Sequence, residues 1–269
     1  MCRSLPPVSF MGNNMTERID RRVLGAIRLR SRATGEPVVD RMMLSGEDAR
    51  FVRNRSHLYV ITSAPGLEAH EQAFSQPPTE PALGSVEVTV TISDPAGRYL
   101  PRTLIMNLPR DPDPEHRDDE NSLFRPVEAN LYPSATAPID VNWSTVRASV
   151  MWASDATPVA GALLRVVRTV DEAVLASGLS DPQGEALVII PGIPITNFAT
   201  EEDEEDEESG MGPVVVSEVP ARLEVSYNPG ADWPLDMDAA EAAHTDFLRA
   251  TQALTLRTGR MERVTIQLT

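Results

Sequence analysis

Short apolar runs separated by turn-forming residues make up most of the patterned part of the chain. Val86–Ile92 alternates apolar and polar residues strictly, and Val264–Leu268 does the same near the end. A period of two is typical of strands with one buried face. Three more runs rich in Val, Leu and Ile lie between Val146 and Ile193, divided by Gly, Pro, Asp and Ser. The pattern predicts a mainly β protein of antiparallel strands.

Two turn motifs each occur twice. Ser93-Asp94-Pro95-Ala96-Gly97 returns with one change as Ser180–Gly184, and the segment Thr34–Val38 (T-G-E-P-V) is echoed by Thr157–Gly161 (T-P-V-A-G). Pro suits the second position of a β-turn and Gly the last, so each motif alone is ordinary turn chemistry. Together they predict two similar β-sandwich modules.

The modules are expected to be joined by a charged linker at residues 111–122. The first module spans 18–110 and the second 123–269, with a flexible leader at 1–17 in which Met15 is an alternative start. The linker (R-D-P-D-P-E-H-R-D-D-E-N from Arg110) is polar and contains Pro, as is common between domains.

The second module contains two exceptions to the β pattern. Glu201–Glu208 is a run of eight acidic residues within 197–212, where charge repulsion favours a disordered loop. Residues 236–252 fit a helix, because Met237, His244 and Leu248 fall on one face and acidic residues start it. Whether the acidic run binds cations or a basic partner is left open.

Charge excludes several functions. All 24 basic residues are arginine, which rules out a P-loop lysine or a Schiff-base lysine. Residues 111–269 carry 10 arginines and 29 acidic residues, so nucleic acid is not expected as the main partner. No apolar run reaches the roughly 20 residues of a membrane helix, and no signal peptide is apparent, which predicts a cytoplasmic protein without membrane insertion.

Candidate metal and catalytic residues do not form a recognisable constellation. No two histidines stand at a metal-binding spacing, and a single cysteine, Cys2, excludes a disulfide framework. A G-x-S-x-G nucleophile motif is absent. The acidic residues of 111–120 lack the EF-hand spacing. The four histidines, expected in a turn (His57), in loops (His70, His116) and on a helix face (His244), are taken as ordinary, so no catalytic, cofactor-binding or metal-binding residue is assigned and no enzyme is predicted.

Two alternatives remain open. A hydrolase would require His116 or His244 beside two carboxylates in a pocket. A carbohydrate-binding or adhesive module would require exposed tryptophans, and Trp143, Trp152 and Trp233 all lie in the second half of the chain. Buried tryptophan in a sandwich core is the simpler explanation.

The stretch Val146–Ile193 resembles the carboxypeptidase-regulatory-like, or transthyretin-like, β-sandwich. The resemblance is carried by Pro158–Ala162 (P-V-A-G-A) and by the turn and strand Ser180–Val188. Such domains accompany carboxypeptidases as non-catalytic modules, so the resemblance implies a binding or structural role without a cofactor.

A wider arrangement also resembles proteins encoded beside phage-tail-like contractile injection particles. It comprises the blocks Asp94–Arg102, Leu108–Asp111, Leu123–Val127 and Leu131–Ser134, within residues 20–195. The expected function is therefore a structural adaptor that docks on other protein subunits of an assembled particle.

Overall fold

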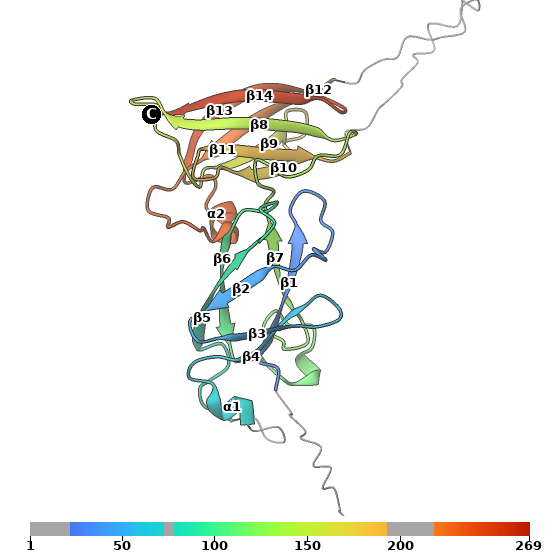
Figure 1. Ribbon diagram of the computed structural model, residues 1–269, viewed down its shortest axis with the longest axis vertical. Helices are drawn as coiled ribbons and strands as arrows, with labels where there is room; N and C mark the ends of the chain where they lie inside the picture. Colours follow the sequence, from blue (N-terminus) through green and yellow to red (C-terminus); the bar gives the residue numbers. More distant parts are fainter. Residues whose placement is uncertain (1–21, 73–77, 193–217) are drawn as a thin grey trace, which may run out of the picture.

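A computed structural model describes residues 22–72, 78–192 and 218–269 of the chain. It contains two β-sandwiches, one above the other along the long axis of the molecule (Figure 1). The mainly β prediction is confirmed. The leader 1–17 with Cys2 and Met15, and the acidic loop 197–212, lie outside the described residues. No helix in the described part is long and apolar enough to span a bilayer.

The first sandwich packs a four-stranded sheet against a three-stranded one. Inward side chains such as Ile27, Val90 and Leu104 fill its core, because alternate residues of each strand face the opposite sheet. The strand order in the four-stranded sheet is β3 (Arg50–Arg53), β4 (Tyr59–Ser63), β1 (Gly25–Ser31), β7 (Val127–Leu131). In the three-stranded sheet it is β2 (Met43–Gly46), β5 (Val86–Ser93), β6 (Arg102–Leu108). The short helix α1 (Glu68–Gln72) follows β4, and the 3-10 turn η1 (Pro114–His116) lies between β6 and β7.

The second sandwich has the same number of strands. Its core is a separate cluster that includes Val146, Leu164, Val188 and Leu223. The strand order in the four-stranded sheet is β10 (Val174–Leu179), β9 (Leu163–Arg168), β12 (Glu218–Ser226), β13 (Leu248–Arg257). In the three-stranded sheet it is β11 (Glu185–Ile190), β8 (Ser144–Trp152), β14 (Met261–Leu268). The helix α2 (Met237–Ala242) lies between β12 and β13 in the chain.

The two sandwiches share the arrangement of all strands except the third. In each, the first strand pairs antiparallel with the fourth and parallel with the last (β1 with β4 and β7; β8 with β11 and β14). The third strand differs, because β3 joins the sheet of β1 whereas β10 joins the sheet opposite β8. All other strand pairs in the two sandwiches are antiparallel, as the sequence predicted.

One of the two repeated motifs reflects this topology. After the first strand of each sandwich, the amide of a buried valine donates to the strand it has just left: Val38 to Leu29 (2.9 Å) and Val159 to Val150 (3.0 Å). The S-D-P-x-G motifs are not equivalent, since one joins the fifth and sixth strands and the other the third and fourth. In both, however, the aspartate accepts backbone hydrogen bonds and the glycine has a positive φ.

The strand pairings place the boundary between the two sandwiches later in the chain than the sequence predicted. β7 pairs with β1 in parallel, so residues 127–131 complete the first sandwich instead of starting the second. The segment 111–122, expected as a linker between modules, is therefore a connection within the first sandwich, between β6 and β7. The last strand of the sheet comes from far along the chain, and local polarity carries no information about that pairing.

The predicted helix over 236–252 is largely wrong. α2 ends at Ala242, and residues from Leu248 onward form β13, which pairs with β12 along nearly its whole length. Asp236 caps the helix by accepting from the amides of Asp238 and Ala239. Tertiary pairing with β12 overrides the local helical pattern beyond residue 244.

Candidate functional site

The α2 segment lies where the two sandwiches meet (Figure 1). Arg102, the first residue of β6, is fully buried there, and its Nη2 lies 2.7 Å from the Asp238 carboxylate and 3.8 Å from Asp236. Its Nη1 donates to the carbonyl of Asn130 in the first sandwich (2.8 Å). Separating the two modules would leave this buried charge without its partner, which is costly.

A second polar contact crosses the same junction. The hydroxyl of Tyr132 donates to the Glu241 carboxylate (2.6 Å), and Arg32 binds the same oxygen (3.0 Å). Burial alone raises the pKa of Glu241, but the hydrogen bonds from Tyr132, Ser177 and Arg32, with the charge of Arg32, outweigh it and leave that pKa below its ordinary value. Burial, followed by the charge of Glu241, raises the pKa of Tyr132. The pair is therefore neutral tyrosine and ionised glutamate at pH 7.

Apolar side chains surround these polar contacts. One cluster draws on both sandwiches: Leu100, Tyr132, Leu163, Leu179, Leu235 and Met237, with Trp233 and Ala240 packed against it. The backbone amide and the hydroxyl of Thr103 also donate to the carbonyls of Leu235 and Pro234 (both 2.8 Å). The junction is therefore a packed interface and not a flexible tether.

A pocket of about 400 Å³ opens beside the junction, between α2 and the end of β12. Ser226 lines it, and its hydroxyl lies 2.9 Å from Nδ1 of His244. Nε2 of His244 lies 3.0 Å from Glu224, two residues before Ser226 on the same face of β12. Both Ser226 and His244 are buried.

This chain of serine, imidazole and carboxylate has the group order of an acyl-transfer triad. Its carboxylate is shared, because Arg222 also binds Glu224 (2.8 Å). Burial alone raises the pKa of Glu224, but the hydrogen bonds from Arg222 and then His244 keep it below its ordinary value. The set ties the segment after α2 to the sheet. Among the described residues His244 and His116 each form an ion pair with one carboxylate.

His244 is the residue that the sequence located least well. It was expected on the face of a long helix, and it lies in the turn after α2, packed on the sheet. Its spacing from Glu224 is 20 residues, so no local pattern links the two. The sequence did indicate one property correctly: His244 falls on the apolar face of the predicted helix, which indicates a buried side chain.

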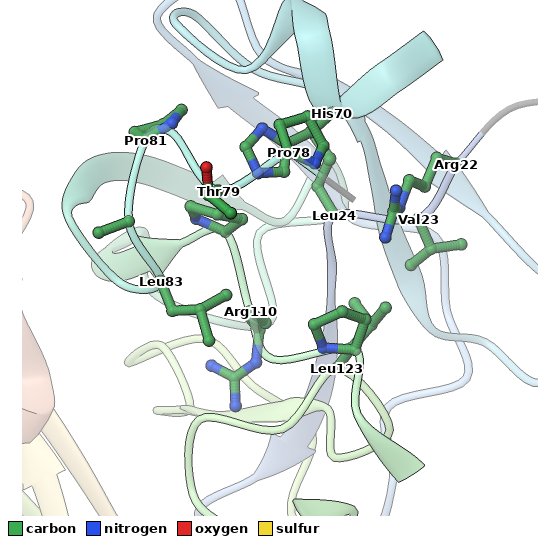
Figure 2. A pocket seen from close by; sticks show the side chains of 13 residues that line it. Arg22, Val23, Leu24, His70, Pro78, Thr79, Pro81, Leu83, Arg110 and Leu123 are labelled. Atoms are coloured by element: carbon green, nitrogen blue, oxygen red, sulfur yellow. The ribbon is translucent and has the colours of Figure 1, made fainter. Parts of the chain in front are cut away.

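His70 was expected in a loop and is instead a buried residue of α1. It faces an apolar pocket of about 370 Å³ at the end of the first sandwich remote from the junction, together with Leu24, Pro78 and Leu123 (Figure 2). Burial, followed by the charge of Arg22, lowers the pKa of His70. Nδ1 of His70 has no hydrogen-bond partner among the described residues.

The remaining candidates have ordinary surroundings. His57 is exposed in a turn with φ of 63° and contacts Arg53 (2.7 Å), while His116 is exposed and paired with Asp111 (2.8 Å). In the acidic stretch 111–120, the carboxylates of Asp111 and Asp113 accept backbone amides. Within the described ranges, no three acidic, histidine or cysteine side chains are grouped to hold a metal.

The tryptophans are all half-buried. Trp152 meets Tyr227 edge-on with ring centroids 5.5 Å apart beside the second core, and Trp143 and Trp233 pack on smaller apolar clusters. Of the arginines near the start of the chain, Arg28 and Arg30 both bind Glu128 on β7. These arginines therefore belong to a charged face of the sheet. Arg18 and Arg21 lie outside the described residues.

Comparison with known proteins adds little. No family model matches the chain, and no curated protein matches it. Among solved structures, "The Bacillus anthracis TIE protein" aligns with 91% of this chain at 7% identity and a TM-score of 0.28. The minor pilin GBS52 of Streptococcus agalactiae aligns with 91% of this chain and 95% of its own, at 8% identity and a TM-score of 0.27. The chain spans about a third (34%) of the TIE protein structure, and both likenesses are too slight to support an argument about function.

Proposed function

We propose that this protein is a non-catalytic structural adaptor that docks on other proteins and holds two β-sandwiches at a fixed angle. The observation that carries the proposal is the fully buried Arg102, paired with Asp238 across the junction. A flexible tether would leave the modules free to move, whereas a paired buried charge within an apolar interface resists reorientation. A rigid pair of modules suits a component that sets the spacing of its neighbours.

The contact surface in this proposal is the edge strand β13. It is the longest described strand, at 10 residues, and its only hydrogen-bonded neighbour strand in the described chain is β12. Between Arg249 and Arg257 it contains neither a charged residue nor proline. Proteins usually protect free edges with short strands, lysine or proline. An unprotected edge of this length suits the addition of a partner strand.

The particular assembly in this proposal is a phage-tail-like contractile injection particle, in which the protein would reside in the cytoplasm. The support is the resemblance in the blocks Asp94–Arg102, Leu108–Asp111, Leu123–Val127 and Leu131–Ser134. Two of these blocks contribute to the junction, through Arg102 and Tyr132.

The test is to recover the protein from its native host through a C-terminal tag and to identify co-purifying proteins by mass spectrometry. Stoichiometric sheath, tube or baseplate proteins would support the particle assignment. Other stoichiometric partners would support an adaptor of a different assembly. Recovery of the protein alone would contradict the docking function and would direct attention to a glycan screen for the adhesive alternative.

A matched pair of variants tests the edge. Thr255→Lys places a charge at an exposed position of β13, and Thr89→Lys makes the same change on β5, which has neighbours on both sides. Partner recovery should fall several-fold for Thr255→Lys and stay near wild type for Thr89→Lys. Equal recovery in both variants would exclude β13 as the docking edge.

A further inference from the structure

The described chain contains two buried arginines, and their surroundings differ. Arg102 is fully buried and ion-paired with Asp238. Arg110 is 9% exposed, and no carboxylate of the described residues lies within ion-pair distance of it. A guanidinium does not lose its proton in a protein, so Arg110 remains a buried cation. Such a charge is unfavourable unless an anion compensates it.

The hydrogen bonds of Arg110 leave part of its guanidinium available. Nε donates to the carbonyl of Ser122 (3.0 Å), and Nη2 donates to the carbonyl of Glu120. Nη1 makes no hydrogen bond with the part of the chain that the structure describes. Burial lowers the pKa of Arg110; the charge of Glu120 opposes this change, and Arg125 adds to it. The charges near Arg110 are therefore the carboxylate of Glu120 and, with a smaller effect, the guanidinium of Arg125.

Arg110 and Arg125 both line a cleft of about 800 Å³ between β6 and the connection that leads to β7. The cleft also has Arg28 and the carboxylates of Glu120 and Glu128 on its walls. Glu128 is already bound by Arg28 (3.4 Å) and Arg30 (3.0 Å). Of the carboxylates that line the cleft, this leaves only Glu120 to face the guanidinium groups of Arg110 and Arg125.

The guanidinium of Arg110 belongs to this cleft and not to the apolar pocket of His70. Figure 2 shows it pointing away from His70 and Pro78. Arg110 lines both cavities. The cleft is therefore polar and carries cations at its wall, whereas the neighbouring pocket is mostly apolar.

We propose that this cleft binds an oxyanion, either a carboxylate or a phosphate group, through Arg110 with Arg125 as the second cation. Arginine suits this role because its planar fork of donors matches two oxygens of such a group. Arg110 is held in place by its two carbonyl acceptors before any ligand arrives. Arg110 and Arg125 bring two positive charges to the cleft and Glu120 one negative charge, so a bound oxyanion would balance the remaining positive charge.

The test uses the purified full chain and two probes, inorganic phosphate and acetate, at constant ionic strength maintained with chloride. Binding is measured by calorimetry and by the shift of Tm. At least one probe should bind saturably and raise Tm. Phosphate alone would identify a phosphate group as the ligand class, and acetate alone a carboxylate. Absence of a saturable effect from both probes would overturn the proposal.

Two arginines of the same connection provide the matched variants. Arg125→Gln removes a cation of the cleft, and Arg117→Gln removes one that is exposed and does not line it. Arg125→Gln should weaken binding at least five-fold, and Arg117→Gln should leave it unchanged. Equal weakening by both variants would indicate general charge screening and would also overturn the proposal. Both residues are exposed, so neither change should prevent folding.

Discussion

The guanidinium of Arg102, on β6 of the first sandwich, lies 2.7 Å from the carboxylate of Asp238, on α2 of the second. Arg102 is fully buried, whereas the side chain of Asp238 is 53% exposed. The pair therefore has one partner that cannot reach water and one that can. Loss of the aspartate leaves the arginine with Asp236 at 3.8 Å as its nearest carboxylate.

Asp238→Ala is expected to lower the free energy of unfolding by about 1–2 kcal/mol, because a charged hydrogen bond is lost at a half-exposed site. It should also uncouple the modules. All three tryptophans lie in the second half of the chain, so fluorescence reports on that half and circular dichroism on both. Urea transitions from the two probes should coincide in the wild type and separate in the variant. Asp246→Ala, at an exposed position, is the control, and unchanged stability in Asp238→Ala would contradict the role of this pair.

Acid should weaken the junction through Glu241. Its pKa is below the ordinary value in the folded protein, so the folded state stabilises the ionised form. This contribution is fully present above the ordinary glutamate pKa of about 4.3 and is lost as pH falls through the lower folded value. Glu241→Gln should therefore flatten the decline of stability below about pH 5 relative to wild type. Glu87→Gln, at an exposed site, should leave the pH dependence of stability unchanged. If both variants lose stability with falling pH at the same rate, Glu241 is not the group responsible for the decline.

The twin S-D-P-x-G turns offer a test of local packing. Gly97 and Gly184 have φ of 68° and 76°, but a Cβ on Gly97 would meet nothing within 4 Å, whereas one on Gly184 would collide with the carbonyl of Val150. Gly97→Ala should cost about 1 kcal/mol for the left-handed backbone alone. Gly184→Ala should cost about 3 kcal/mol or more, because the backbone must also shift. Equal losses of stability for the two variants in thermal unfolding would mean that the turn at Gly184 can move to accommodate the added Cβ.

His244 should matter for stability because it joins Ser226 and Glu224. His244→Ala removes a buried ring, leaves the Ser226 hydroxyl without its partner and leaves Glu224 with Arg222 alone, which we expect to cost about 2–3 kcal/mol. His116→Ala removes an exposed ion pair with Asp111 and should cost less stability than His244→Ala. Chemical unfolding of both variants measures the difference. A small effect at His244 would mean that the polar set does not hold the segment after α2 to the sheet.

The periodicity of the sequence was sufficient for strands but not for their partners. The runs at Val86–Ile92 and Val264–Leu268 became β5 and part of β14, because alternation reports directly on a buried face. The pairing of β7 with β1 depends on residues about 100 positions apart, for which local polarity carries no signal. The polar stretch at 111–122 therefore suggested a boundary where the structure has a connection within one sandwich.

Repetition was informative for the motif that follows the first strand of each sandwich, and misleading for the S-D-P-x-G turns. Val38 and Val159 follow the first strand of each sandwich and make equivalent hydrogen bonds. The less similar pair of motifs is therefore the one that occupies equivalent positions in the two sandwiches. The identical-looking pentapeptides lie at different points of the fold. The junction could not be predicted at all, since Arg102 and Asp238 are 136 residues apart and neither has an unusual local sequence.

The parallel pairing of first and last strands determines how each sandwich would respond to mechanical tension. Force on the start of β1 and on the end of β7 pulls the two strands in opposite directions along their common axis, and the same holds for β8 and β14. The inter-strand hydrogen bonds then bear the load together in shear instead of opening one by one. Each module is therefore built to extend little under load until many bonds fail at once.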